Sequence, residues 1–553
     1  MAINLLSPGV KITEADLTSS TISTGTTVGG IAGAFKWGPT SEPTLVSSES
    51  ELAAKFGAPS TTTNVDFITA ANFLAYSPNL YVVRVVDAAN TKNAAANSAA
   101  APLVENQDDY ENTTFVNEGL WIAKYPGAIG NSLKVAVCGN TAGFATWADG
   151  NTVFDFAPAT SPWATSKGLT SANDEVHILV IDEDGLFSGV AGTVLEKFPA
   201  LSKASDARGN DGGSNYYKNV INTKSKYIWW TGHPSASNWG SASNTSYTSP
   251  AAANTSLAGG LDGTADTAAY VTAYQEFTNK QNVTISVLPV SNSDATVVNA
   301  AIAVAEGRKD AMVCFSPERA DVVNAPGSEV TNIKGYADTV TRSTYALMDS
   351  NWKYQYDKYN DVYVYVPCAA DVAGCLARVD SDRAPWFSPA GYTNGRILNA
   401  VKLAWNPTPG QRDELYKYAV NPVFTQPGRG TVLFGDKTFV TTTGSFSRVN
   451  IRRLFIQMET AIEGLAGDIL FEQNDAATRE RFVNTVTPYL RTVQGGRGIE
   501  EFRVVCDATN NTDDIVTSNG FVADIFVRPI GSINFIQLNF VSVAGAAAFA
   551  ALG

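Results

Sequence analysis

Hydrophobic and polar positions recur with two periods along the chain, and their order predicts helices that lead into short apolar strands. Residues 64–87 combine an amphipathic helix pattern, a Ser-Pro break and a β-branched run that is typical of a buried strand. Three later stretches repeat this order, with helix patterns in 265–280, 294–308 and 334–349 that lead into strand patterns in 282–290, 310–317 and 361–368. Helices that alternate with apolar strands predict a largely parallel sheet covered by helices on both faces.

Residues 89–257 interrupt this pattern with long stretches rich in Ala, Ser, Asn and Thr, which are typical of exposed loops. A strand pattern in 176–185 and a helix expected near 194–204 indicate a folded unit rather than a linker. We therefore expect an inserted domain on the outside of the molecule.

The clearest helix pattern lies in residues 450–470, where apolar side chains recur every three or four positions. These side chains are Ile451, Leu454, Phe455, Met458, Ile462, Leu465 and Ile469. Asn474 or Asp475 can cap a second helix, which Pro488 is expected to kink or restart. Strand patterns follow in 501–507, 520–529 and 532–543.

Length and composition limit the class of protein. A chain of 553 residues exceeds the ~250 to 300 residues at which a single core stops growing, so we expect two to four domains. No apolar run reaches the ~20 residues of a membrane-spanning helix, and the amino terminus lacks the pattern of a secretion signal, which predicts folding in a cytoplasm without direct membrane contact. The net charge of −14 disfavours direct binding of nucleic acid, because that binding depends on Lys and Arg that neutralise phosphates.

Few residues could carry chemistry. The five cysteines are scattered, without a C-x-x-C pair, and are expected to be small buried hydrophobes rather than disulfides or zinc ligands. His177 and His233 have no ligand or nucleophile at a recognisable spacing, and the acidic clusters at 182–184 and 513–514 match no calcium loop. We expect no catalytic residue, no metal and no cofactor.

Two glycine-rich segments raise the question of a nucleotide site. Residues 26–33 lack the G-x-G-x-x-G order that dinucleotide binding requires. Residues 421–438, NPVFTQPGRGTVLFGDKT, contain three glycines and a Lys-Thr pair, but a phosphate loop needs Gly-Lys-Ser/Thr at the start of a helix. The pattern after Thr438 is β-like, so we interpret both segments as structural.

Motifs spread along the whole chain resemble those of a known family. They are SPGVKITEAD, VGGIAGAFKWGPTSEPTLVSSESELAAKFGAP and FLAYSPNLYVVRV in the first part, YPGAIGNSL and LAGGLDG in the middle, and VPCAADVAGCLARVDSDRAPWFSPAGYTNGRI, the segment 421–438, RRLFIQMETAI and LFEQND in the last part. Together they resemble the tail sheath proteins of contractile-tailed bacteriophages, especially those of T-even-like myophages.

The resemblance implies a multi-domain α/β subunit, with a mixed α+β C-terminal domain and arms at both ends that add strands to neighbouring subunits. It implies stacked hexameric rings in a helix around a tail tube, in a metastable extended state that contracts irreversibly and drives the tube through the host envelope. The implied partners are copies of the chain, the tail tube protein, and baseplate and tail terminator proteins. The implied location is the virion tail, after assembly in the host bacterial cytoplasm.

Two alternatives remain beside this interpretation. Within the same class, the chain could be the sheath of a related contractile injection system. From a different class, it could be a cytoplasmic nucleotide-binding α/β enzyme, which would need a phosphate loop and catalytic groups at the strand ends.

The resemblance also divides the chain. It implies an N-terminal arm in 1–22, a middle α/β domain in 23–88 with 258–385, an inserted outer domain in 89–257, an inner domain facing the tail tube in 386–529, and a C-terminal strand and tail in 530–553. The residues expected to exchange between subunits are Ile3, Leu5, Val10, Ile12, Phe535, Ile536, Leu538, Phe540 and Val541. For the last strand, ordinary pairing within one chain is the alternative.

Arginines without intervening lysines mark the region between residues 448 and 503, and they could form a positive inner face that grips an acidic tube. They are Arg448, Arg452, Arg453, Arg479, Arg481, Arg491, Arg497 and Arg503. The alternative is pairing within the chain, with Glu459, Glu463, Glu472 and Glu480. We assign the tube contact to Arg479, Arg481 and Arg491 on the second helix.

Overall fold

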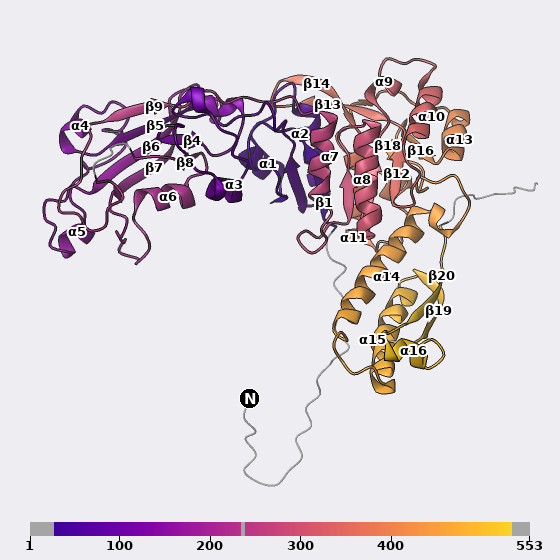
Figure 1. Ribbon diagram of the computed structural model, residues 1–553. Helices are drawn as coiled ribbons and strands as arrows, with labels where there is room; N and C mark the ends of the chain where they lie inside the picture. The colour runs from indigo at the N-terminus through magenta and orange to yellow at the C-terminus, as the bar shows by residue number, and fades with distance from the viewer. Residues whose placement is uncertain (1–26, 234–237, 533–553) are drawn as a thin grey trace, which may run out of the picture.

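The computed structural model describes residues 27–233 and 238–532. Three parts follow one another in Figure 1: an outer part around β5 to β9, a central part around a large sheet, and a C-terminal part from α14 to β20 that projects away from the central part. None of the described helices combines the length and the apolar character that a membrane crossing requires.

The central part contains a seven-stranded sheet in the order β16-β12-β11-β10-β1-β3-β2. Its strands are β1 (Gly29–Gly33), β2 (Thr44–Val46), β3 (Leu80–Arg84), β10 (Val287–Pro289), β11 (Met312–Phe315), β12 (Ala346–Asp349) and β16 (Val420–Asn421). All neighbours pair in parallel except β2, which runs antiparallel to β3 at one edge. The parallel sheet expected from the sequence is therefore confirmed.

Helices cover both faces of this sheet. Successive side chains of each strand point to opposite faces, and both sets are apolar, so both faces must be covered. In β11, Val313 and Phe315 join the core beneath α7 and α8, whereas Met312 and Cys314 join the core beneath α2 and α11. The helices of this part are α1 (Glu49–Phe56), α2 (Asn64–Leu74), α7 (Thr267–Gln275), α8 (Ala295–Arg308), α9 (Arg319–Val322), α10 (Glu329–Thr339), α11 (Ala369–Asp382), α12 (Gly391–Asn394) and α13 (Pro409–Lys417).

Two predictions about this part were wrong or incomplete. The strand expected in 361–368 forms β14 (Val362–Pro367), but it pairs antiparallel with β13 (Trp352–Asp357), which also pairs with β15 (Lys402–Leu403). The parallel sheet takes β12 instead. It also includes β16, so it extends past residue 385, where the sequence interpretation placed the start of the inner domain.

The outer part is built on a four-stranded antiparallel sheet in the order β7-β6-β5-β9. Its elements are the short 3-10 helices Ser98–Ala100 and Ala128–Ser132, α3 (Gln107–Asn112), β4 (Trp121–Ala123), β5 (Leu133–Cys138), α4 (Thr141–Ala145), α5 (Pro162–Ser166), β6 (Glu175–Asp182), β7 (Thr193–Ser202), α6 (Tyr217–Lys224), β8 (Ile228–Trp230) and β9 (Ala253–Ser256). The strand expected in 176–185 is confirmed as β6.

The helix expected near 194–204 is wrong, because these residues form the edge strand β7. Every residue of β6 is buried, so β6 needs a partner strand for its backbone groups, and β7 supplies it. Pro199 would interrupt a helix but is tolerated in an edge strand, where its missing N–H costs no ladder bond.

Candidate assembly surfaces

The C-terminal part is a small unit with its own core. A 3-10 turn (Ser445–Ser447) leads into α14 (Val449–Gly467), followed by α15 (Ala476–Gly495), β19 (Ile499–Val505), α16 (Asp513–Thr517) and β20 (Asp524–Pro529). Leu454 and Met458 of α14 share one apolar cluster with Phe482, Val486 and Leu490 of α15. The periodicity of residues 450–470 therefore predicted the buried face of α14 correctly.

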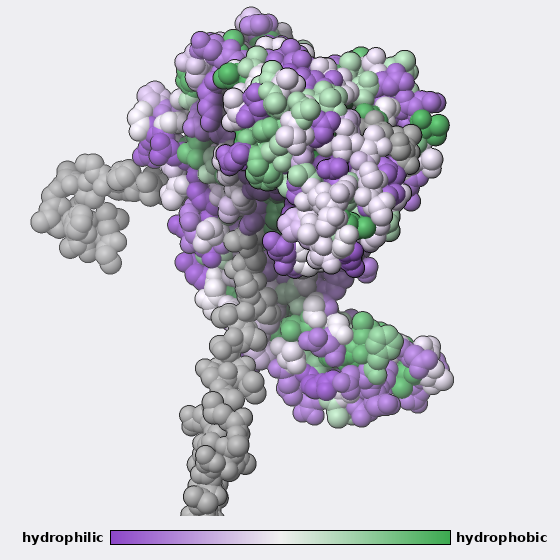
Figure 2. All heavy atoms as spheres, turned by 90° about the vertical axis from the view of Figure 1, so that its left-hand side faces the viewer, coloured by the Kyte–Doolittle hydropathy of each residue, from purple (hydrophilic) through white to green (hydrophobic). Residues whose placement is uncertain are grey.

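The carboxylate of Asp475 caps α15 by accepting a hydrogen bond from the Thr478 N–H at 2.8 Å. α15 runs through Pro488 as one helix, so the restart that was one of the two expectations there does not occur. Seen end-on in Figure 2, this unit is a separate mass with a hydrophilic lower surface and a hydrophobic band on its upper side.

A two-stranded antiparallel sheet closes the unit. β19 and β20 pair over their length, with Phe502 opposite Val527 and Val504 opposite Ile525, and these four side chains pack against the helices. Phe526, which is 58% exposed, lies on the other face beside charged residues. Within the described residues, each of the two strands pairs only with the other. Both outer edges therefore present backbone donors and acceptors to which a further strand can pair.

The chain leaves this sheet at a junction between the C-terminal and central parts. The Ile530 N–H donates to the Gly498 carbonyl at 3.1 Å, which ties the end of β20 to the start of β19. Two residues later, the Ser532 hydroxyl donates to Asp436 of the central part at 2.6 Å. The last described residues thus contact both parts before the chain continues to its C-terminal segment.

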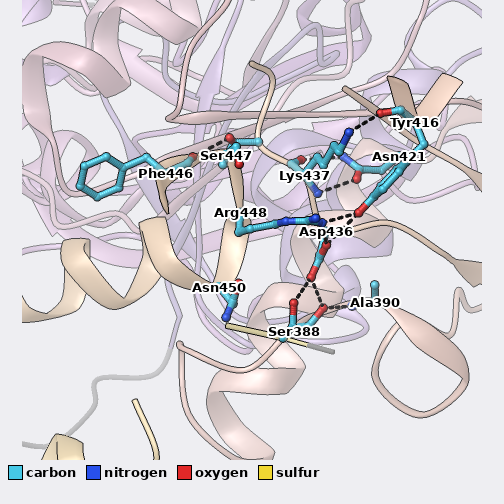
Figure 3. A network of polar contacts seen from close by, with 12 residues as sticks. Ser388, Ala390, Tyr416, Asn421, Asp436, Lys437, Phe446, Ser447, Arg448 and Asn450 are labelled. Atoms are coloured by element: carbon cyan, nitrogen blue, oxygen red, sulfur yellow. Dashed lines mark hydrogen bonds and ion pairs between the residues drawn. The ribbon is translucent and has the colours of Figure 1, made fainter. Parts of the chain in front are cut away.

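Asp436 is the centre of the polar network in Figure 3. Its side chain is 5% exposed and accepts from Arg448 at 2.8 Å, from the Tyr416 hydroxyl at 3.1 Å and from the Ser388 hydroxyl at 3.2 Å. Burial, together with the adjacent Asp436, raises the pKa of Tyr416 to about 12, so this hydroxyl keeps its proton at neutral pH. Several charge-assisted hydrogen bonds on one buried carboxylate hold the segments that meet here.

The same network shows whether the segment 421–438 is a nucleotide site or a structural segment. Its first part folds into the hairpin β17 (Val423–Gln426) and β18 (Gly430–Leu433), and no helix begins at Thr438. Lys437 donates from Nζ to the Tyr416 carbonyl at 2.7 Å, and its N–H donates to Asn421 at 2.8 Å. The Gly-Asp-Lys-Thr sequence therefore forms a junction in the fold.

The arginines between 448 and 503 separate into two groups. Arg452 and Arg453 are buried, and Arg453 pairs with Asp380 while Arg452 lies over the Phe446 ring at 3.9 Å. Arg448 is partly exposed and pairs with Asp436. The buried pair, Arg452 and Arg453, therefore belongs to the interior and not to an exposed inner face. Of the four glutamates proposed as partners, Glu472 pairs with Arg481 at 3.2 Å, whereas Glu463 pairs with Lys280 of the central part.

The three arginines assigned to the tube contact lie on α15, but they do not form one stripe. Arg481 and Arg491 are exposed, and about 100° per residue places them within one broad side of the helix. Arg479 is half-buried on another side and donates to the Asn474 side chain at 3.0 Å. Two of the three therefore share one side of α15, about 15 Å apart along the helix axis.

The residues assigned to strand exchange lie outside the described residues. These are Ile3, Leu5, Val10 and Ile12 near the amino terminus and Phe535, Ile536, Leu538, Phe540 and Val541 near the carboxyl terminus. The sequence interpretation missed Asp436 and Ser532. The sequence did contain a signal for Asp436, because a charged Asp-Lys pair lies between a hairpin pattern and the longest amphipathic helix pattern. That pair was considered only as part of a phosphate loop.

All five cysteines are buried and free, as expected. His177 is also buried, inside β6. No group of three or more His, Cys, Asp or Glu that could hold a metal ion occurs among residues 27–233 and 238–532.

Comparison with known proteins connects these surfaces to a family. Residues 26–85 match the tail sheath protein Gp18 domain III N-terminal region, residues 263–439 match the phage tail sheath protein central domain, and residues 441–542 match the phage tail sheath C-terminal domain. The chain is 30% identical to the tail sheath protein of Enterobacteria phage T4 over 665 aligned positions, with 99% of each chain covered. The chain belongs to the phage tail sheath protein family.

Other members and structures agree with this assignment. The tail sheath protein of Salmonella phage ViI is 29% identical, over 97% of this chain and 96% of that protein. The fold is similar to that of the sheath tail protein Lin1278 from Listeria innocua, with a TM-score of 0.55, 13% identity and 92% of each chain covered. It is also similar to the anti-feeding prophage helical sheath in the contracted state, with a TM-score of 0.50, 13% identity, and 98% of this chain and 100% of that chain covered.

As a tail sheath protein, the chain is a component of the phage virion and a subunit of a contractile tail sheath. The family implies a structural role. The α/β architecture with several separate sheets is the sheath fold.

Proposed function

We propose that the chain polymerises as stacked rings of six subunits in a helix around the tail tube. The array is built in a metastable extended state and contracts once, irreversibly, which drives the tube through the host envelope. Assembly takes place in the host bacterial cytoplasm, and the array ends at baseplate and tail terminator proteins. We assign residues 1–22 and 530–553 to the exchanged arms, 89–257 to the outside, and the unit from α14 to β20 to the tube side.

The observation that carries this proposal is the small β19–β20 sheet, whose two outer edges are open within the described residues and whose last strand leads toward the C-terminal segment. A strand added from another subunit satisfies these backbone groups without a deep pocket. Alternating apolar side chains, such as Ile536, Leu538 and Phe540, set the register, because a shift by one residue would turn them to the wrong face.

Exchanged strands explain how an array can contract and stay connected. If the strands remain paired, each subunit can rotate about the junction at Asp436 while its contacts with other subunits are replaced. A difference of a few kcal/mol per subunit then sums over the array, and no nucleotide is needed. The hairpin fold of residues 423–433 supports a non-enzymatic role, since a phosphate loop leads into a helix.

A related injection machine remains the second candidate. The fold is similar to that of the anti-feeding prophage sheath, but the sequence identity is 13%, so this similarity concerns the architecture and does not favour that machine over a phage tail. Both candidates require the same assembly, so one experiment tests them together.

The proposal is tested by electron microscopy of the purified full chain beside a variant that lacks residues 1–22. We expect hollow striated tubes from the full chain and none from the truncated chain. A finer pair of variants keeps the length of the arm: Ile3→Asp with Leu5→Asp removes apolar strand residues, whereas Ser19→Asp with Ser20→Asp adds the same charge at polar positions. The first pair should prevent tubes and the second should allow them. Tubes from the truncated chain would contradict exchange of the amino-terminal arm.

A further inference from the structure

A pocket of about 390 Å³ lies at the point where the described part of the chain ends. Ser532, the last described residue, is one of its lining residues. The other lining residues come from the start of α12, one side of α13, Pro422 between β16 and β17, and the turn that follows β18. We call this feature the exit pocket.

The exit pocket has a polar and an apolar set of lining residues. The polar set is used within the fold, since Ser388, Tyr416 and Ser532 all bond to Asp436 (Figure 3). The two further charged residues, Arg412 and Asp413, have opposite signs and favour no charged ligand. The apolar set consists of Ala390, Pro409, Pro422 and Phe434.

Exposed aromatic rings extend the exit pocket onto the surface. Phe434 is 43% exposed and Tyr392 is 38% exposed, and their ring centroids lie 5.6 Å apart. The Phe434 ring also contacts the Phe424 ring at 5.3 Å, and the Arg412 guanidinium lies over the Phe424 ring at 4.1 Å. Exposed apolar side chains that lie together mark a binding surface, whereas single ones do not. The ligand expected here is therefore apolar.

The residues that follow Ser532 supply apolar side chains within reach. Residues 533–543 read INFIQLNFVSV, and apolar and polar positions alternate over 536–540 as they do in a strand. Ile533 and Phe535 are one position out of phase with this alternation, so a continuous strand would turn them to its other face. Three residues span at most about 11 Å, which keeps Phe535 close to a pocket that Ser532 lines.

We propose that the exit pocket binds Ile533 and Phe535 of the same chain, with Phe535 against the exposed ring of Phe434. The pocket volume lies in the range of sites that hold small organic ligands, so it is large enough for apolar side chains. Phe535 then belongs to the root of the C-terminal segment, and the strand begins at Ile536.

This docking has a mechanical consequence, and only this consequence rests on the proposed function. If the strand that begins at Ile536 pairs with another subunit, a pull on it is carried by the exit pocket. The pocket is built from segments that follow β16 and β18 and from α13, all of which belong to the central part. The load therefore reaches the central sheet directly and not through β20 alone.

Cleavage by chymotrypsin tests the docking in the full-length chain before it polymerises. Phe535 and Phe540 are two cleavage sites in the same segment, and mass spectrometry separates their products. We expect cleavage after Phe535 to be slower than after Phe540 by about tenfold or more, relative to the ratio in a synthetic peptide of residues 530–545, because only the open form is cleaved. The same ratio in the chain and in the peptide would overturn the docking.

A pair of variants tests the role of the pocket itself. Phe434→Ser removes the exposed ring and should abolish most of the protection of Phe535. Phe471→Ser is the matched control, because Phe471 is fully exposed in the C-terminal part, and it should leave the protection within about twofold of the wild-type value. Protection that is equal in the two variants would remove Phe434 from the site and overturn the proposal.

Variants of the segment keep the test valid if Phe434→Ser disturbs the fold. Phe535→Asp and Gln537→Asp introduce the same charge two positions apart. Hydroxyl-radical labelling of Phe434 should rise several-fold in Phe535→Asp, because its ring loses its cover, and should stay at the wild-type level in Gln537→Asp. Labelling at the wild-type level in both variants would show that Phe535 does not cover Phe434.

Dilution and polymerisation separate the remaining outcomes. Docking within one chain gives the same protection of Phe535 at every concentration, whereas protection that disappears on dilution would assign the exit pocket to another copy and overturn the proposal. A chain that never polymerises but protects Phe535 would overturn only the proposed assembly. A chain that polymerises, but whose unpolymerised form leaves Phe535 unprotected, would overturn only the docking.

Discussion

At the scale of single residues, buried polar groups show where the fold depends on a particular hydrogen bond. Asp436 accepts hydrogen bonds from groups on four segments of the chain. In the outer part, His177 joins two segments through its hydrogen bonds with Phe156 and Ala200. The sequence showed both residues but not their roles, because a hydrogen-bond network depends on which segments meet. Spacing along the chain carries no signal for these partners, which lie 12 to 96 positions from Asp436.

His177 predicts a pH dependence of stability. Its Nδ1 accepts from the Ala200 N–H at 2.9 Å, so its Nε2 carries the proton and donates to the Phe156 carbonyl at 2.8 Å. Both nitrogens are used by the neutral ring, and burial lowers the pKa of His177 below its usual value. As the pH falls below about 6.5, the unfolded chain takes up a proton that the folded chain does not, so the free energy of unfolding should fall.

The measurement compares the melting temperature of the wild-type chain with that of His177→Gln between pH 7.5 and 5.5. Glutamine cannot be protonated in this range, so the variant should lose less stability on acidification, although it is less stable at neutral pH. Equal losses in both proteins would show that His177 does not titrate between the folded and unfolded states.

At the scale of elements, periodicity predicted the structure where burial is one-sided. In α14 this holds from Phe455 onward, where one face packs into the core and the other becomes exposed, whereas the first turns, from Val449 to Leu454, are buried on every side. The expectations from periodicity and local propensity were wrong where contacts with distant segments determine the secondary structure. Residues 194–204 became a strand because the buried β6 needs a partner, and Pro488 stayed inside α15 because that helix packs against α14 and the sheet on both sides of the proline. Local propensity is a weak prior against such packing.

The exposed arginines of α15 give a prediction at the same scale. Arg481→Glu with Arg491→Glu should leave polymers of the chain alone unchanged, since Arg481 makes only a surface ion pair, worth about 1 kcal/mol or less. The double variant should no longer sediment with tail tubes, because the tube side of the sheath would repel an acidic tube.

Lys167→Glu with Lys224→Glu is the matched control, because it makes the same charge change at exposed positions of the outer part. This control should still sediment with tubes. Binding of the α15 double variant as strong as that of the control would remove the tube contact from these two arginines. Arg479, which is held by Asn474, is expected to contribute less than either.

At the scale of the whole molecule, the architecture suits a subunit that is completed by its neighbours. The central sheet has helices on both faces and the outer part has its own cores, whereas the unit from α14 to β20 ends in a sheet of two strands. Isolated two-stranded sheets are marginal in water, and this one depends on the helices beneath it. The order of helices and strands predicted the central sheet. Nothing in the order of a single chain predicts which edge receives a strand from another chain.

The account depends most on strand exchange at β19 and β20. The measurement that tests it most directly is a helical reconstruction, by electron cryo-microscopy, of the polymer formed by the full chain, at a resolution that traces the backbone. We predict additional strands paired with the outer edges of β19 and β20, continuous with the terminal segments of neighbouring subunits. A polymer in which both edges remain unpaired, with the terminal segments folded onto their own subunit, would contradict the account.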